Sequence, residues 1–213
     1  MRVRNISNAK ELLKEYAYYI ENPSLSKGNW KAHFKNHNPI HIEIGMGKGQ
    51  FLTTLAKTYN SINYIGIEKI EELVLKSVRN LENTEISNMA LIHLNALNLQ
   101  DVFLKGEVKR IYLNFSDPWP KARHEKRRLT HSNFLKMYRS ILSEDGEIHL
   151  KTDSLDLFEF SLGEIDRESF YLNEIIYDLY NKQYNEIAKT EYEEKFISQG
   201  KPIYKCIASI NKD

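Results

Sequence analysis

The segment IHIEIGMGKGQF, from Ile40 to Phe51, gives the strongest indication of the fold, because an apolar strand leads through a glycine-rich turn into a helix. Gly45, Gly47 and Gly49 permit a tight turn and let a ligand approach the backbone with no Cβ in the way. In an open α/β sheet, ligands bind beyond the carboxyl ends of the strands. The turn is therefore predicted to border a ligand site.

From that turn onward, segments of strand length alternate with amphipathic segments of helix length. Strands are predicted at residues 40–44, 62–67, 89–94, 110–115 and 146–151, and helices at residues 50–58, 69–82 and 131–142. This alternation predicts an α/β fold with a mostly parallel twisted sheet and helices on both faces. After Asp153 come a helix (155–165), a strand (170–177), a polar stretch and a strand (203–210), which predict antiparallel strands at the C-terminal edge.

The composition is typical of a globular protein, with 41% hydrophobic and 28% charged residues among 213. We interpret residues 1–213 as a single domain, in which residues 1–35 form a candidate mobile N-terminal arm. No apolar stretch reaches the ~20 residues needed to span a bilayer, and the N-terminus is too polar for a signal peptide. We therefore expect a cytoplasmic protein with no membrane partner. The cations of the arm are Arg2, Arg4, Lys27, Lys31 and Lys35.

Metal and disulfide chemistry is not expected from the cysteine and histidine content. Cys206 is the one cysteine of the chain, which excludes an internal disulfide and a cysteine-rich zinc cluster. Its apolar flanks predict a buried structural thiol. The seven histidines are scattered with no ligand-like spacing, so no metal is predicted.

Glu43, two residues before the first glycine of the turn, favours one class of cofactor over another. The spacing G-x-G-x-G differs from the G-x-G-x-x-G of dinucleotide-binding proteins. A carboxylate here would repel a pyrophosphate, whereas it suits the ammonium and sulfonium groups of S-adenosylmethionine. The charge therefore predicts S-adenosylmethionine rather than NAD, and a purely structural turn is the alternative.

Polar residues also end the second and third predicted strands. Glu68 is placed to accept hydrogen bonds from both ribose hydroxyls of an adenosine cofactor, and capping of the next helix is a compatible second interpretation. Asn95 is placed to hydrogen-bond the adenine, or else to serve as a turn residue.

The segment NFSDPWPKARHEKRRL, from Asn114 to Leu129, is the most informative part of the chain. The fourth predicted strand leads directly to Asp117, after which two prolines stiffen the turn and fix the direction of Trp119. A run of cations follows, although the net charge of the whole chain is only +1. A carboxylate, an aromatic ring and clustered cations suit an unstacked purine with its phosphates, and a solvated loop is the alternative.

Five segments of the chain resemble the bacterial tRNA (guanine-N7-)-methyltransferases: IHIEIGMGKGQF, IGIEK, NFSDPWPKARHEKRRL, LKTD and TEYEEKFISQGKPIYK. The resemblance extends from about residue 4 to residue 208. It implies a Rossmann-like class I methyltransferase fold, S-adenosylmethionine as cofactor and tRNA as partner. The implied reaction is methyl transfer to N7 of guanosine in the tRNA variable loop, at position 46.

The resemblance also implies roles for individual residues, with Asp117 as the catalytic residue. The cofactor would be bound by Glu43, Gly45, Gly47, Glu68, Asn95 and Asp117. The substrate would be contacted by Lys121, Asp153, Thr190, Glu191, Tyr192 and Glu193. The RNA would be contacted by Arg123, His124, Glu125, Lys126, Arg127 and Arg128.

Three other functions fit parts of this pattern. An amino-methyltransferase acting on DNA would use a D/N-P-P-aromatic turn at the place of Asp117, but the basic run and the missing adjacent proline oppose it. An NAD-dependent dehydrogenase is disfavoured by Glu43 and the glycine spacing. A non-catalytic RNA-binding scaffold would not need carboxylates at three strand ends. A monomer and a homodimer are both compatible with the sequence.

Overall fold

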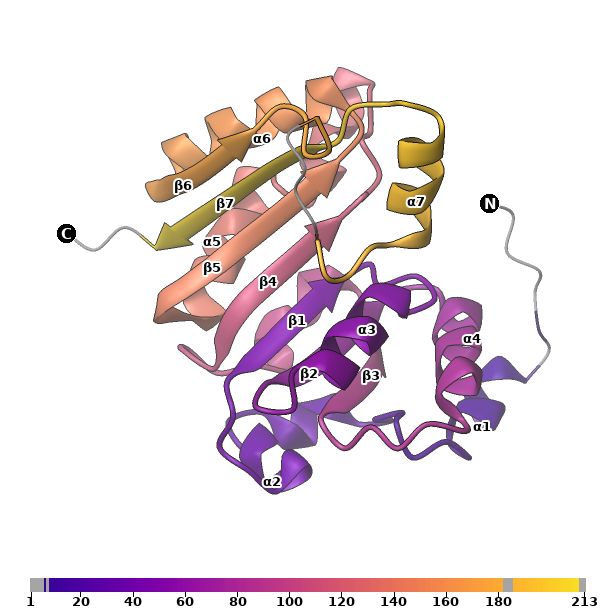
Figure 1. Ribbon diagram of the computed structural model, residues 1–213. Coiled ribbons are helices and arrows are strands. Elements are labelled where there is room, and N and C mark those ends of the chain that lie inside the picture. The colour runs from indigo at the N-terminus through magenta and orange to yellow at the C-terminus, as the bar shows by residue number, and fades with distance from the viewer. Residues whose placement is uncertain (1–5, 7, 182–185, 211–213) are drawn as a thin grey trace. The chain divides into compact units, whose positions relative to one another are not determined.

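The computed structural model describes residues 6, 8–181 and 186–210. The chain divides into two compact units, residues 1–104 and 105–213 (Figure 1). In each unit, strands and helices alternate along the chain for most of its length. The predicted organisation as a single domain is not tested by this division and stays a prediction.

The first unit contains three parallel strands in the order β3-β2-β1. They are β1 (Ile40–Ile44), β2 (Asn63–Glu68) and β3 (Met89–His93). The connections contain α3 (Gln50–Thr58) and α4 (Glu71–Leu81), and the 3₁₀ helix η2 (Ala96–Asp101) follows β3. Every residue of β1 and β2 is buried, including the polar His41, Glu43, Asn63 and Glu68.

The described N-terminal residues also pack within the first unit. They form α1 (Ala9–Leu13), the 3₁₀ helix η1 (Pro23–Ser26) and α2 (Trp30–Phe34). Trp30 is fully buried, stacks on Phe103 with ring centroids 5.7 Å apart, and donates its indole N–H to the Val102 carbonyl at 3.1 Å. Arg2 and Arg4 of the predicted arm lie outside the described residues.

The second unit contains four strands in the order β4-β5-β7-β6. They are β4 (Val108–Asn114), β5 (Leu142–Thr152), β6 (Phe170–Ile176) and β7 (Tyr204–Ile210). β4 and β5 are parallel, whereas β7 is antiparallel to both of its neighbours. The predicted change from parallel to antiparallel pairing near the C-terminus is confirmed.

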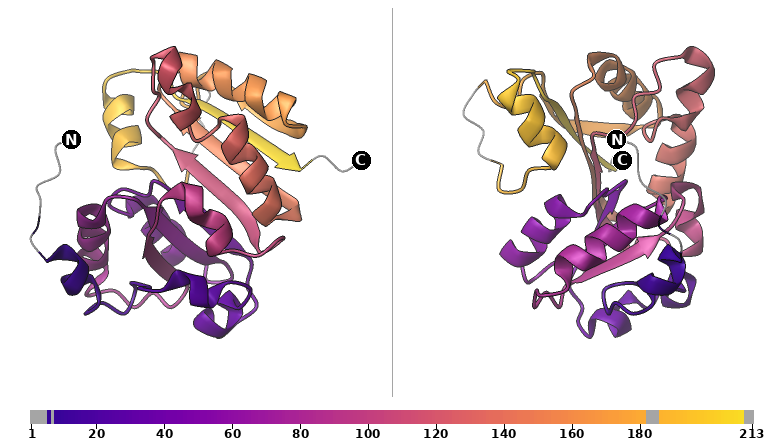
Figure 2. Two further views of the ribbon diagram at one scale, coloured as in Figure 1. Left: turned by 180° about the vertical axis from the view of Figure 1, so that it is seen from behind. Right: turned by 90° about the vertical axis from the view of Figure 1, so that its right-hand side faces the viewer.

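The two faces of this second sheet differ in polarity. α5 (Ser132–Ile141) and α6 (Leu155–Arg167) lie on one face, and α7 (Glu191–Ser198) lies on the other (Figure 2). Because side chains of a strand alternate between faces, β5 directs Ile148 and Leu150 to one side and His149 and Lys151 to the other. Cys206 of β7 pairs with Leu150 in register and is buried, as its apolar flanks predicted.

Helix α7 lies in the part of the chain that the sequence pattern indicated only as a polar stretch. Its only buried side chain is Glu193, so no apolar periodicity marks it. A capping box begins the helix: the Glu193 amide donates to the Thr190 hydroxyl at 3.0 Å, and the Thr190 amide donates to the Glu193 carboxylate at 3.3 Å. The spacing T-x-x-E was therefore the available signal.

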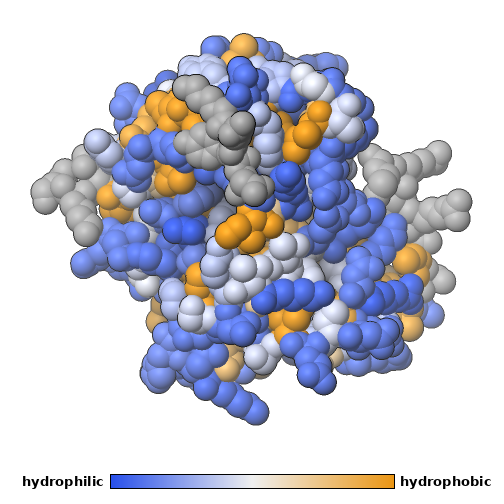
Figure 3. Space-filling model, viewed as in Figure 1, coloured by the Kyte–Doolittle hydropathy of each residue, from blue (hydrophilic) through white to orange (hydrophobic). Residues whose placement is uncertain are grey.

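The surface drawn in Figure 3 is mostly hydrophilic, and hydrophobic residues are scattered over it. Scattered apolar residues are normal on protein surfaces. Within the described ranges, no helix has both the length and the apolar character that crossing a membrane requires.

Candidate functional site

The turn between β1 and α3 depends on its glycines. Gly45 and Gly47 have φ values of 79° and 58°, in the left-handed region that other residues rarely adopt. The amides of Gly45 and Met46 both donate to the Ile67 carbonyl, at 2.8 and 3.1 Å, and so fix the turn to β2. A Cβ built on Gly45 or Gly47 would meet no atom of the described residues within 4 Å. The backbone here borders space that a ligand can occupy.

Glu68, the last residue of β2, is fixed beside this turn. Its carboxylate accepts hydrogen bonds from the amides of Gly47 at 3.1 Å and Ile70 at 3.0 Å. Burial raises the pKa of Glu68, and the hydrogen bonds from these two amides oppose the rise. Since each carboxylate oxygen can accept two hydrogen bonds, Glu68 can hold the turn and a ligand's hydroxyl groups together.

The other two predicted cofactor residues of the first unit differ in burial. Glu43 is 2% exposed and pairs in register with Gly66 of β2, in the strand that leads into the turn. Asn95 is exposed, and its side-chain oxygen accepts from the Leu97 amide at 3.1 Å, which caps η2. The turn role considered for Asn95 is thus present, and its contact with a cofactor stays a prediction.

In the second unit, the turn that follows β4 has an unusual backbone. Phe115 and Trp119 have φ values of 50° and 42°, although neither is a glycine. Such conformations persist only where the surroundings enforce them. The Phe115 amide donates to the Lys151 carbonyl at 2.8 Å. Asp117 lies between the two constrained residues and is exposed, so its side chain is presented by a turn of defined shape.

Arg128 holds the far side of this turn. Its guanidinium donates to the carbonyls of Pro118 at 3.0 Å and Trp119 at 3.2 Å, and lies 4.3 Å from the centre of the Phe160 ring. With only 8% of its surface exposed, Arg128 is used within the protein. Among the predicted RNA contacts, Arg128 is therefore buried and bonded within the protein, whereas Arg127 is exposed.

The other cations of the predicted RNA-contacting run are presented to solvent. The run folds as a 3₁₀ helix, η3 (Ala122–Arg127), in which His124 and Glu125 are half-buried. The guanidinium of Arg127 lies 4.9 Å from the centre of the Trp119 ring. The exposed cations of η3 are Arg123, Lys126 and Arg127, and Lys121, predicted to contact the substrate, is exposed directly before η3.

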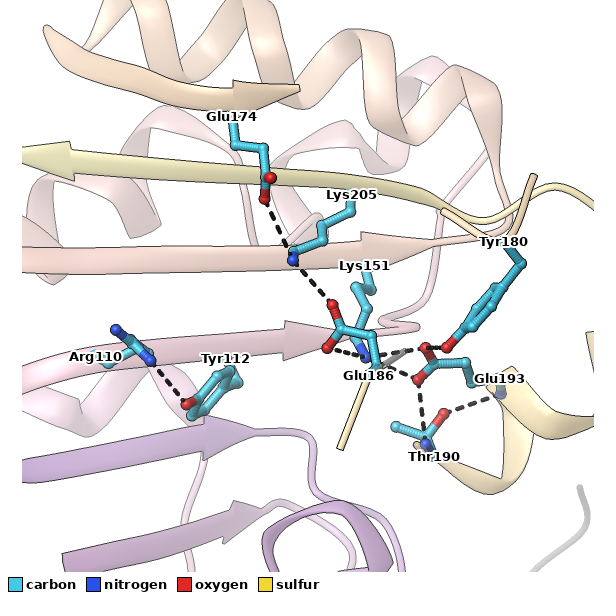
Figure 4. Close-up of polar contacts among 9 residues, drawn as sticks. All are labelled: Arg110, Tyr112, Lys151, Glu174, Tyr180, Glu186, Thr190, Glu193 and Lys205. Atoms are coloured by element: carbon cyan, nitrogen blue, oxygen red, sulfur yellow. Dashed lines mark hydrogen bonds and ion pairs between the residues drawn. The ribbon is translucent and has the colours of Figure 1, made fainter. Parts of the chain in front are cut away.

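The predicted substrate segment at the start of α7 is divided by burial. Glu191 and Tyr192 are exposed, whereas Glu193 is fully buried. The Glu193 carboxylate accepts from the ammonium of Lys151 at 2.8 and 3.0 Å and from the hydroxyl of Tyr180 at 2.5 Å (Figure 4). Burial and the Glu193 carboxylate raise the pKa of Tyr180. The sequence did not single out Lys151 or Tyr180, because their partner is distant along the chain.

Asp153 follows β5 directly and is half-buried. The next residue, Ser154, caps α6 by accepting from the Leu157 amide at 3.3 Å. Among residues 6, 8–181 and 186–210, no three His, Cys, Asp or Glu side chains are grouped so as to hold a metal ion.

Comparison with known proteins relates the chain to methyltransferases. Residues 37–206 match the family described as "Putative methyltransferase". The chain is 65% identical over 210 residues to the tRNA (guanine-N(7)-)-methyltransferase of Alkaliphilus oremlandii, with 99% of this chain and 100% of the relative covered. It is 55% identical to the enzyme of the same name from Alkaliphilus metalliredigens, with 99% and 100% covered.

A solved structure shares the fold. The 16S rRNA methyltransferase KamB matches with a TM-score of 0.65 over 99% of this chain and 97% of that chain, at 11% identity. This likeness confirms the predicted class I methyltransferase fold.

Proposed function

The chain belongs to the tRNA (guanine-N(7)-)-methyltransferase family, and from this we propose that its first unit binds S-adenosylmethionine and its second unit binds the target guanine. The reaction is methyl transfer to N7 of guanine in tRNA. The finer assignment is the guanosine at position 46 of the variable loop. A tRNA substrate also supports a cytoplasmic location. The observation that carries the proposal is the glycine turn fixed to Glu68, with open space above its backbone.

The residues of the first unit fit the chemistry of S-adenosylmethionine. Glu43 supplies negative charge near a turn that a cation-bearing ligand would approach, and Glu68 suits the two ribose hydroxyls. Gly45 and Gly47 leave room where side chains would otherwise stand. Asn95, exposed after β3, is assigned to the adenine end.

The residues of the second unit fit a guanine within an RNA strand. We assign Asp117 and Asp153 to the base, and the exposed Glu191 and Tyr192 to the same substrate. A carboxylate can accept hydrogen bonds from guanine N1–H and N2–H. The exposed cations Arg123, Lys126 and Arg127 are assigned to the RNA backbone, because phosphate contacts position a nucleic acid without reading its sequence. The half-buried His124 and Glu125 of the same run are assigned to the RNA as well. Lys121, which starts this run four residues after Asp117, is assigned to the substrate.

Methyl transfer to guanine N7 requires positioning and charge stabilisation rather than a general base that removes a proton. S-adenosylmethionine supplies an electrophilic methyl group on a positively charged sulfur. Guanine N7 carries an in-plane lone pair and no proton, so no residue has to remove one. Positive charge moves onto the purine during transfer, and a fixed carboxylate stabilises it. We assign this role to Asp117, which the constrained turn presents.

The proposal is tested by incubating the protein with unmodified tRNA and methyl-labelled S-adenosylmethionine, then identifying the labelled nucleoside. We expect N7-methylguanosine, and fragment mapping should place it at position 46. Label in an adenine or cytosine derivative would contradict the reaction. Label in N7-methylguanosine elsewhere in the tRNA would contradict only the position.

Arg127 and Arg128 are predicted to differ in their effect on tRNA binding. Plotted against log salt concentration, the logarithm of the tRNA association constant falls along a line. Arg127→Ala should make this line less steep by about 0.7–0.9, the value for one lost phosphate contact on a single strand or a duplex. Arg128→Ala is the matched control, since its guanidinium is bound to Pro118 and Trp119, and its slope should equal that of the wild type. Filter binding over a range of salt concentrations measures both slopes. An unchanged slope for Arg127→Ala would mean that this arginine makes no phosphate contact.

A further inference from the structure

Lys151 lies where three segments of the proposed substrate site meet. It is the residue before the last of β5, two positions before Asp153. Its carbonyl accepts from the amide of Phe115, which begins the Asp117 turn. Its ammonium contacts both carboxylate oxygens of Glu193, in the first turn of α7. One residue thus connects the turn after β4, the end of β5 and the start of α7.

Helix α7 contacts the Asp117 turn at a second place. The rings of Phe196 and Phe115 have centroids 5.8 Å apart. Phe115 is the residue with the left-handed backbone that precedes Ser116 and Asp117. Because α7 is attached to β5 through Glu193 and to the turn through Phe196, a shift of α7 would also displace the Asp117 turn.

The carboxylate of Glu193 is occupied within the protein. It is fully buried and accepts hydrogen bonds from Lys151, from the hydroxyl of Tyr180 and from the amide of Thr190 (Figure 4). A buried carboxylate bonded by a cation, a hydroxyl and an amide is well compensated, and a substrate would have to displace these donors to reach it. The exposed Glu191 and Tyr192 precede it immediately, so Glu193 fixes the backbone that presents them.

We propose that Lys151 is a positioning residue: through its ion pair with Glu193, completed by Tyr180, it fixes α7 and the Asp117 turn in the arrangement that receives the target guanine. This inference rests on the proposed function. It assigns to Glu193 an anchoring role in place of the direct substrate contact that the sequence predicted. Lys151 touches neither substrate nor cofactor and acts through α7 and Phe115.

Lys205, on the neighbouring strand β7, provides a matched comparison. It pairs with Lys151 in register and belongs to the same polar face. Its ammonium contacts Glu186 at 2.9 Å and Glu174 at 3.3 Å. Burial would lower the pKa of Lys205, but these carboxylates raise it overall. Lys205 therefore has a comparable ionic environment. It shares Glu186 with Lys151, whose ammonium lies 3.8 Å from that carboxylate, but Glu186 and Glu174 both lie outside α7.

The test measures single-turnover methylation of saturating tRNA, normalised to the number of cofactor-binding sites so that unfolded protein does not count. Lys151→Met should lower the rate about 10–30-fold, since small misplacements of reacting groups cost up to about 10²-fold. The dissociation constant for tRNA should change by less than about threefold, because phosphate contacts dominate it. Lys151→Arg keeps the charge and should recover most of the rate.

Two further variants keep the inference falsifiable if Lys151→Met folds poorly. Tyr180→Phe removes one donor to Glu193 without leaving a charge unpaired, and should lower the rate about threefold or more. Lys205→Met should retain the wild-type rate to within about twofold, because its ion pairs do not hold α7.

A wild-type rate per binding site in Lys151→Met or in Tyr180→Phe would overturn the inference, as would an equal loss in Lys205→Met. A gain in tRNA affinity on removing Lys151 would also overturn it, because it would mean that a released Glu193 binds substrate. These outcomes leave the proposed function intact. Absence of N7-methylguanosine with the wild-type protein would contradict both the proposed function and the inference about Lys151.

Discussion

Asp117→Asn is expected to lower the single-turnover rate of tRNA methylation by about 10²–10³-fold, the loss seen when one electrostatic stabiliser is removed from an enzyme. The substitution keeps the size and shape of the side chain and removes its charge. If Asp117 stabilises the positive charge that develops on the purine, the loss appears in the chemical step. The constrained residues Phe115 and Trp119 on either side of it make a large relocation of the amide unfavourable.

The measurement uses saturating tRNA and cofactor, and dissociation constants for both are determined separately. Asp166→Asn, an exposed aspartate of α6, is the matched control and should leave rate and affinities unchanged. Asp153→Asn shows whether the second carboxylate contributes to the same step. A wild-type rate for Asp117→Asn would exclude Asp117 as the catalytic residue. A loss confined to binding would assign Asp117 to ligand orientation alone.

Gly47→Leu is expected to weaken S-adenosylmethionine binding about 100-fold or more, equivalent to about 2.7 kcal/mol or more. The leucine side chain would fill the space that borders the turn and would disturb the amide that donates to Glu68. A leucine at a φ of 58° also costs about 1–2 kcal/mol in backbone strain, which lowers the stability of the free and the bound protein alike and does not itself weaken binding. Calorimetric titration with the cofactor measures the affinity.

Gly106→Leu separates the effect of backbone strain from the effect of filling the space that the cofactor would occupy. Gly106 has a φ of 78°, and a Cβ built on it also meets no atom of the described residues within 4 Å. Its substitution should therefore cost similar backbone strain while leaving cofactor affinity unchanged, because Gly106 lies outside the β1–α3 turn. Equal affinities for the two variants would show that the space above Gly47 is not where the cofactor binds.

Much of the fold was predictable, because burial leaves its pattern in the sequence. The strand at 40–44 and the helix at 50–58 have the predicted bounds, since apolar residues and a glycine turn delimit them. β5 begins at Leu142, four residues before its predicted start, because its first residues, Ser143 to Asp145, are polar and partly or fully exposed. Helix α7 was not predicted, because its one buried side chain is a carboxylate and a search for apolar periodicity does not detect it.

The candidate site was predictable in its residue types but not in the direction of each side chain. A run of cations does not reveal that Arg128 supports the turn while Arg127 is exposed. Likewise, the segment from Thr190 to Glu193 does not reveal that its last member is buried against Lys151, 42 positions earlier in the chain. Such assignments depend on long-range contacts, whereas the glycine turn and Glu68 follow from local sequence and strand order.

The burial of Cys206 makes the thiol a reporter of opening in the second unit. Burial raises its pKa to about 12, so in the folded protein almost none of it is the thiolate that alkylating reagents attack. Since it is the one cysteine of the chain, labelling by iodoacetamide reports molecules in which the packing around β7 has opened. The labelling rate under native conditions therefore measures how often this part of the enzyme opens, without an engineered probe.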